Sequence, residues 1–174
     1  MGSQGDGCQQ NAENVDATVS ELENAGEISS LHVDLSNPDS VADFIARLQD
    51  VREINYLVNA SGICRPKPFL EATAGEYDAY LNINRSFYLI TQAVARKMKE
   101  NGKGGAIVNI GSYRARHAIK GSLTWAYSMA KRASTRLPNR LPWNWPSIRS
   151  GSTPLRRASW KPTYSTACSN LLKG

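Results

Sequence analysis

The chain has 174 residues, 41% of them hydrophobic and 21% charged, which is typical of one globular domain that can bury a sizeable core. It has no apolar run long enough to span a bilayer and no secretory signal pattern, so we expect a cytoplasmic protein. Its three scattered cysteines do not form a disulfide framework, and no Cys/His spacing predicts a metal site.

The net charge of +6 is distributed unevenly along the chain. Residues 1–134 carry 14 Lys and Arg against all 15 acidic groups, whereas residues 135–174 carry seven basic groups and no acid. The second segment also holds five of the eight prolines and three of the four tryptophans. We therefore predict a partial dinucleotide-binding α/β domain over 1–134 and an irregular or out-of-frame basic tail over 135–174.

Helical and strand patterns alternate along the first segment. We predict helices over 11–26, from Pro38 after the cap Asn37, over 75–101, and from near Trp125. Between them, residues 28–33, 54–60 and 106–112 have the length and apolar character of buried strands. This alternation favours a parallel sheet covered by helices, the doubly wound class.

Ligands bind such sheets at the carboxyl ends of the strands, so the residues that follow each strand are the candidates for function. Asp34 and Leu35 follow the first predicted strand. "NASGI", which begins with Asn59, Ala60, Ser61 and Gly62, follows the second, and Ser112 ends the third.

Tyr127 and Lys131 lie one helical turn apart, so their side chains share a face of the last predicted helix. A phenol exchanges protons poorly at neutral pH, but a neighbouring ammonium favours the phenolate. Such a pair can exchange a proton with an alcohol or carbonyl oxygen while a hydride moves at carbon. Taken singly, each of these features can also be explained without a function: Tyr127 and Lys131 as a surface pair, and Asn59 as a turn former. Their order along the chain favours a functional site.

These motifs together resemble the short-chain dehydrogenase/reductases over roughly residues 11–134. "HVDLSNPDSV" is similar to the Asp-containing turn of that family, and "LVNASGI" to its Asn-Asn-Ala-Gly motif. "YDAYLNIN" resembles the helix that carries the family's catalytic Asn, "IVNIGS" ends in its Ser, and "YSMAK" matches its Tyr-x-x-x-Lys.

The resemblance implies an oxidoreductase that transfers a hydride between NAD or NADP and an alcohol or carbonyl substrate. It implies that Tyr127 is the acid/base, that Lys131 tunes it and binds the nicotinamide ribose, that Ser112 orients the carbonyl and that Asn84 anchors a water. For the cofactor it implies a lining of Asp34, Leu35, Asn59, Ala60 and Gly62, together with Tyr127 and Lys131.

The sequence departs from the family at both ends. We find no strand followed by the family's Gly-rich turn, so we expect an incomplete Rossmann-like sheet that lacks its first two strands. Pro138 and Pro142 stand where the last helix should continue, at a cost of about 3 kcal/mol each. If the reading frame of the coding DNA is shifted by one base, the same stretch can encode a helix, a strand and a Pro-Gly loop like those of the family. We therefore interpret the tail as out of frame, and we expect the last core strand to be missing or replaced.

We therefore expect the oxidoreductase activity of this chain to be impaired. Two alternatives stay open at this point: a protein whose basic tail binds nucleic acid or a partner, and a pseudoenzyme that forms a homo-oligomer. The resemblance implies that the helix over 75–101 and the helix of Tyr127 would build the dimer interface.

Overall fold

A computed structural model of the chain describes residues 31–117, 120–137 and 148–153. The predicted helix over 11–26 and the Gly-rich start therefore lie outside the described residues. The described elements, in chain order, are α2 (Pro38–Arg47), β1 (Tyr56–Asn59), the 3-10 turn η2 (Phe69–Glu71), α3 (Ala74–Glu100), β2 (Gly105–Ile110), the 3-10 turn η3 (Tyr113–Ala115), α4 (Trp125–Arg136) and β3 (Ile148–Thr153).

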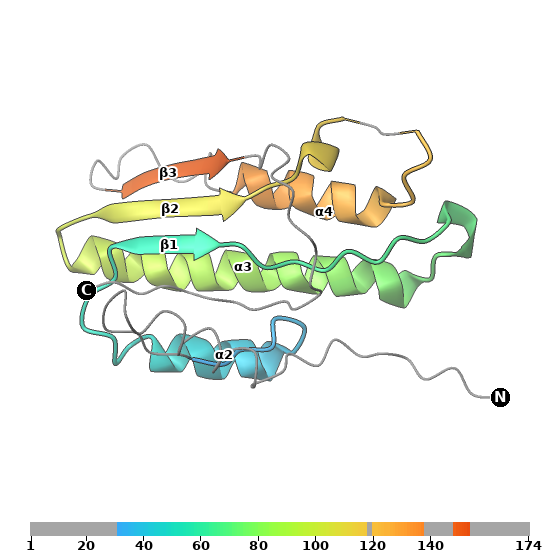
Figure 1. Cartoon of the computed structure of the whole chain (residues 1–174). Helices are drawn as coiled ribbons and strands as arrows, with labels where there is room; N and C mark the ends of the chain where they lie inside the picture. The colour runs from blue at the N-terminus through green and yellow to red at the C-terminus, as the bar shows by residue number, and fades with distance from the viewer. Residues whose placement is uncertain (1–30, 118–119, 138–147, 154–174) are drawn as a thin grey trace, which may run out of the picture.

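The described strands form one parallel sheet in the order β1-β2-β3 (Figure 1). In the register of the sheet, Val58 of β1 lies opposite Val108 of β2, which in turn lies opposite Gly151 of β3. The long helix α3 connects β1 to β2, since parallel neighbours need a crossover. The predicted parallel α/β architecture is confirmed in these strands.

Helices α3 and α4 cover the same face of this sheet. Leu57 and Asn59 alternate with exposed residues along β1, and Asn59 bonds to Thr91 of α3. Asn109 of β2 bonds to the backbone of Ser134 in α4. The two strands therefore present their buried side chains to the pair of helices that carries the candidate catalytic residues.

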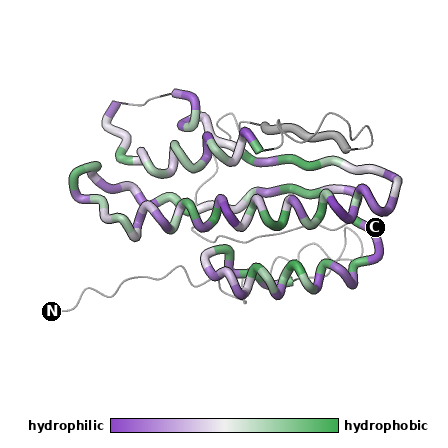
Figure 2. Tube along the Cα trace, turned by 180° about the vertical axis from the view of Figure 1, so that it is seen from behind, coloured by the Kyte–Doolittle hydropathy of each residue, from purple (hydrophilic) through white to green (hydrophobic). Residues whose placement is uncertain are grey.

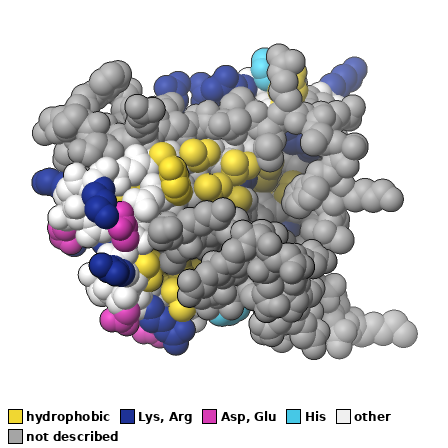
Figure 3. All heavy atoms as spheres, turned by 60° about the vertical axis from the view of Figure 1, so that its left-hand side comes forward, with side chains coloured by type: hydrophobic (Ala, Val, Ile, Leu, Met, Phe, Trp, Pro, Cys, Tyr) yellow, Lys and Arg dark blue, Asp and Glu magenta, His cyan; other side chains and the backbone are white. Residues whose placement is uncertain are grey.

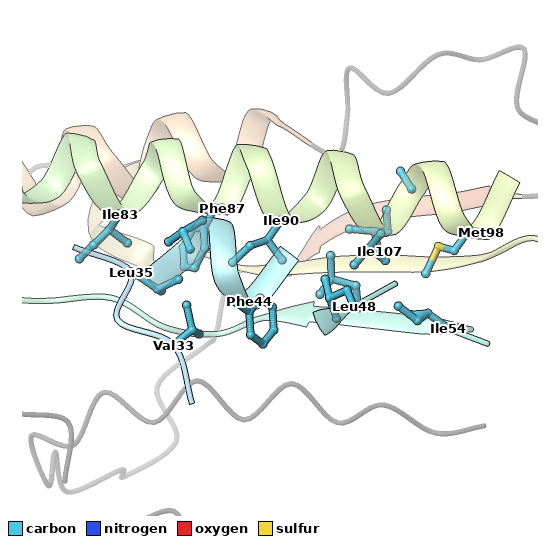
Figure 4. Close-up of a cluster of buried hydrophobic side chains, with 14 residues drawn as sticks. Val33, Leu35, Phe44, Leu48, Ile54, Ile83, Phe87, Ile90, Met98 and Ile107 are labelled. Atoms are coloured by element: carbon cyan, nitrogen blue, oxygen red, sulfur yellow. The ribbon is translucent and has the colours of Figure 1, made fainter. Parts of the chain in front are cut away.

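The hydrophobic core lies between this face, α2 and α3 (Figure 4). Figure 2 shows hydrophobic and hydrophilic positions alternating along α2 and α3, the pattern of helices buried on one side. Lys97 of α3 donates to the carbonyls of Leu48 and Gln49, at 2.9 and 2.6 Å, and so closes the C-terminal end of α2. The cluster of buried residues comprises Val33, Leu35, Val41, Phe44, Leu48, Ile54, Leu57, Ile83, Phe87, Ile90, Val94, Ala95, Met98 and Ile107.

The opposite face of β1 is exposed, which differs from the expectation of strands buried on both sides. Tyr56 is 58% exposed and Val58 is 37% exposed. Hydrophobic side chains also gather on one face of the molecule in the space-filling view (Figure 3). Within the described residues β1 is the edge strand of the sheet.

Two predicted elements differ from the structure. Residues 31–33, the described part of the strand expected over 28–33, have no strand structure, although Val33 is buried in the core. A strand needs a partner, and the described part of the sheet offers none next to them.

The tail expected to be irregular over 135–174 contains the end of α4 and the whole of β3. β3 runs parallel beside β2, so a strand occupies this position in the described part of the sheet. The second edge of β2 offers unpaired backbone groups, and residues 148–153 pair with it in an extended conformation.

Candidate functional site

Helix α3 begins at a capping box that fixes where its functional residues lie. The Thr73 hydroxyl accepts from the backbone N–H of Glu76, and the Glu76 carboxylate accepts from the backbone N–H of Thr73 at 2.8 Å. Lys67 adds an ion pair to Glu76 at 2.9 Å. These bonds, led by the one from the Thr73 backbone, lower the pKa of Glu76 to about 2.

The loops that follow β1 and β2 meet at the carboxyl edge of the sheet. The backbone N–H of Lys67 donates to the carbonyl of Leu123 at 3.0 Å, which joins the two loops. The Tyr80 hydroxyl accepts from the backbone N–H of Arg65 at 2.8 Å and holds the first loop to α3. Burial raises the pKa of this hydroxyl, so Tyr80 is a structural donor and acceptor there.

Tyr127 and Lys131 lie on α4, which begins at Trp125 as the sequence predicts. Lys131 is only 8% exposed, and its ammonium donates to the carbonyls of Ser61 at 3.0 Å and Ile110 at 3.3 Å. These carbonyls follow β1 and end β2, so the ammonium is held between the carboxyl ends of two parallel strands. This is the edge where such sheets bind ligands.

Gly62 is in direct contact with the Lys131 side chain. A Cβ at position 62 would lie 2.9 Å from the Lys131 nitrogen and 3.0 Å from its Cε. The motif "NASG" therefore ends in glycine because Lys131 fills the space that any side chain would need.

A small cavity joins three of the predicted catalytic residues. Its volume is about 10 Å³, close to the space that one water molecule requires. Asn84, Tyr127 and Lys131 line it together with Ser61 and Gly62. Asn84 also donates to the carbonyl of Ala130 at 3.2 Å, so it links α3 to the helix that carries Tyr127.

Ser112 lies at the end of β2 and caps the 3-10 turn η3. Its hydroxyl accepts from the backbone N–H of Arg114 at 3.3 Å. Turn η3 packs against α4, and Arg114 donates to the hydroxyls of Ser122 and Thr124, just before that helix. Ser112 is not among the residues that line the cavity of Asn84, Tyr127 and Lys131.

The side chain of Asn59 is turned into the protein interior. Its amide nitrogen donates to Thr91 at 2.9 Å and to the side-chain oxygen of Asn109 at 2.8 Å, and Asn109 donates to the Ser134 carbonyl at 2.6 Å. A contact of Asn59 with a dinucleotide would therefore use its main chain. Sequence reasoning missed Thr91, Asn109 and Ser134; a polar residue inside an apolar strand, as in "AIVNI", was the available signal.

Asp34 and Leu35 lie in the turn that precedes α2. The Asp34 carboxylate accepts from the backbone N–H and the hydroxyl of Ser36, at 2.8 and 2.7 Å. Leu35 is buried, and its carbonyl accepts from Ser86 of α3 at 2.7 Å. Ala60 is exposed at the end of β1. The structure thus places these residues on the turn and strand end that the sequence indicated.

The half-buried thiol of Cys64 interacts electrostatically with the cationic side chains of Arg114 and Lys131. Burial raises the pKa of this thiol, and the two cations oppose that shift. A thiol with a raised pKa stays protonated at neutral pH, so Cys64 is a poor nucleophile in this site.

In the described part of the chain, no helix is long and apolar enough to cross a membrane. The same residues contain no group of three His, Cys, Asp or Glu side chains that could hold a metal ion.

The model of the family described as short chain dehydrogenase matches residues 2–144. Carbonyl reductase [NADPH] 2 of Sus scrofa is 37% identical over 91 residues, which cover 52% of this chain and 36% of the relative. Gluconate 5-dehydrogenase of Gluconobacter oxydans is 33% identical over 138 residues, which cover 78% of this chain and 53% of the relative. This chain thus spans about half the length, or less, of these curated relatives.

A crystal structure of a metagenomic short-chain oxidoreductase in complex with NADP superposes with a TM-score of 0.71 at 25% identity. The match covers 82% of this chain and 66% of that structure. Because the family model covers most of the sequence, from residue 2 to residue 144, the chain belongs to the short chain dehydrogenase family.

Proposed function

We propose that this chain carries the catalytic half of an NAD(P)-dependent oxidoreductase that interconverts an alcohol and a carbonyl compound. The observation that supports it best is the arrangement of Asn84, Tyr127 and Lys131 around one water-sized cavity. The Lys131 ammonium at the carboxyl ends of β1 and β2 adds the charge that such chemistry needs.

In this proposal Tyr127 exchanges the proton of the substrate oxygen. The Lys131 ammonium lies at the same cavity as Tyr127, and Ser112 donates a hydrogen bond that orients the same oxygen. Asn84 holds a water in the cavity, through which the proton reaches solvent. The nicotinamide supplies the hydride chemistry when it is bound.

We propose that the residues around Lys131 hold the nicotinamide end of a dinucleotide. The Lys131 ammonium is a donor suited to ribose hydroxyls, and the exposed Ala60 leaves the end of β1 open to a ligand. Asp34 and Leu35 would line the adenine side, while Gly62 and the main chain of Asn59 would lie beside the nicotinamide half.

We further propose that turnover by this chain alone is low. In the described residues the sheet stops at β1, whose outer face exposes Tyr56 and Val58, and no Gly-rich phosphate turn links a strand to a helix. We infer that the described residues by themselves would hold the cofactor pyrophosphate weakly. Purified chain with turnover typical of a full-length relative would contradict this part of the proposal.

The test of the catalytic assignment is Tyr127→Phe, compared with Tyr113→Phe as the control. Tyr113 is 54% exposed and next to Ser112, so it matches the chemistry and the neighbourhood without the cavity contact. With concentrated protein and NAD(P)H absorbance as the readout, we expect Tyr127→Phe to reduce turnover roughly 100-fold or more and Tyr113→Phe to leave it near wild type. Equal turnover in both variants would end the assignment.

We also propose that the chain forms a homodimer through α3 and α4. Leu81 and Tyr88, seven residues apart on one side of α3, are 44% and 49% exposed, and Met129 on α4 is 54% exposed. Apolar side chains in such a stripe are better buried against a second helical surface than left in water.

A further inference from the structure

We propose that Asn109 is a positioning residue for the proposed reaction: its side-chain amide replaces the helical hydrogen bond that Pro138 cannot make, and so holds α4 against the sheet. The hydrogen bond itself stands on the geometry, whereas its importance for catalysis rests on the proposed function.

The sequence creates the need for this bond at the end of α4. In an α-helix the carbonyl of residue i accepts from the N–H of residue i+4. For Ser134 that residue is Pro138, which has no N–H whatever its conformation. The Ser134 carbonyl is therefore the first in α4 whose ordinary helical donor is absent for a chemical reason.

The Ser134 carbonyl is also buried, so water has little access to donate a hydrogen bond to it. Ser134 is 6% exposed, and Asn109 is 1% exposed. Leaving a buried carbonyl without a donor costs about 1–3 kcal/mol. The Asn109 amide nitrogen, at 2.6 Å, supplies the donor from the neighbouring strand.

The direction of every bond in this chain of amides is fixed. A carbonyl can only accept, so the NH₂ group of Asn109 must face Ser134 and its oxygen must face Asn59. The NH₂ group of Asn59 then faces Asn109 with one hydrogen and the Thr91 hydroxyl with the other. Thr91 of α3 and Asn59 of β1 thus hold the Asn109 amide in the one orientation that reaches α4.

This bond lies one turn from the groups of the candidate site. Along α4, the Ala130 carbonyl accepts from Asn84, the Lys131 ammonium binds two strand-end carbonyls, and the Ser134 carbonyl accepts from Asn109. A helix moves as a nearly rigid unit over a single turn. Loss of the Asn109 bond therefore changes the position of Lys131, and with it that of Tyr127.

The experiment is a double-mutant cycle in the full chain between Asn109→Ala and Pro138→Ala, measured by urea unfolding. Asn109→Ala removes the donor to Ser134, and Pro138→Ala returns a backbone N–H at the i+4 position. The lost bond to Asn59 is common to both backgrounds and cancels in the difference. We expect Asn109→Ala to lower the folding equilibrium constant about tenfold more when Pro138 is present than in the Pro138→Ala background.

Equal losses in the two backgrounds would overturn the proposal. If Asn109→Ala does not fold, recovery of the folded state in the double variant supports the proposal, and failure to recover it contradicts the proposal, because the bond to Ser134 would then not be the main contribution of Asn109 to stability.

A second measurement separates positioning from simple stability. The rate at which an amine-reactive label modifies the buried Lys131, divided by the rate for the exposed Lys120, should rise several-fold in Asn109→Ala and return in the double variant. Val41→Ala, in the core at α2, is the destabilised control and should leave this ratio unchanged. An unchanged ratio in Asn109→Ala would show that Asn109 does not position Lys131. Neither readout needs turnover, so inactivity of Tyr127 variants and failure of this proposal are distinguishable.

Discussion

At the scale of single residues, position 62 favours glycine because the Lys131 side chain occupies the space beside it, and not because its backbone has a positive φ. Its φ is not among the positive values, which occur at Gly102, Gly104 and Gly121 in the described chain. What excludes a side chain is the Lys131 nitrogen, 2.9 Å from where a Cβ would stand. The glycine of the "NASG" motif thus sets how closely the ammonium approaches the end of β1.

We predict that Gly62→Ala impairs function more than folding. The flexible end of Lys131 can move, so the fold persists, but the ammonium then leaves the carbonyls of Ser61 and Ile110. A displacement of this size reduces turnover roughly tenfold to 100-fold. Gly75→Ala, where a Cβ meets nothing within 4 Å, is the matched control. Steady-state kinetics and thermal unfolding of both variants check the prediction; a parallel fall in stability and turnover of Gly62→Ala would contradict it.

At the scale of elements, the start of α3 depends on the charge of Glu76. Its carboxylate caps the helix and pairs with Lys67, so its pKa is about 2 in the folded chain and about 4.5 when unfolded. The unfolded chain then binds the proton more readily, and acid favours unfolding. This contribution is complete above about pH 4.5 and is lost as pH falls to about 2.

We predict that Glu76→Gln removes this pH dependence. A Gln side chain can still accept from the Thr73 backbone but carries no charge. The melting temperature of wild type should exceed that of the variant above pH 5 and converge on it near pH 2. Circular dichroism melts across this range provide the measurement, with Glu100→Gln at the far end of α3 as the control. A constant difference at all pH values would rule out the charge effect.

The elements also show what the sequence could and could not predict. The helix of Tyr127 and Lys131 was predictable because a spacing of four places two side chains on one face whatever surrounds them. The bond from Lys131 to the Ser61 carbonyl joins residues 70 positions apart, so it depends on how the elements pack. The inward turn of Asn59 depends likewise on Thr91 and Asn109, which only the folded chain brings to it.

The strand prediction over residues 28–33 was wrong in its described part, because an apolar run becomes a strand only beside a partner. The opposite holds for residues 148–153, "IRSGST", whose weak strand pattern is compensated by the available edge of β2.

At the scale of the whole molecule, we predict that the proposed dimer depends on the exposed stripe of α3. Tyr88→Glu places a charge in this stripe and should shift the protein from dimer to monomer, because a buried, unpaired carboxylate is costly. Leu70→Glu is the control, since Leu70 is 94% exposed on η2, outside α3 and α4. Sedimentation velocity at several concentrations measures the change; a monomeric wild type would contradict the dimer.

The order of the strands in the sheet is also their order in the chain. β2 pairs with β1, which precedes it, and β3 pairs with β2, which precedes it. During synthesis, each described strand therefore finds its neighbour already outside the ribosome when it emerges. The unit from β1 through α3 to β2 can therefore assemble while the later residues, β3 among them, are still being translated.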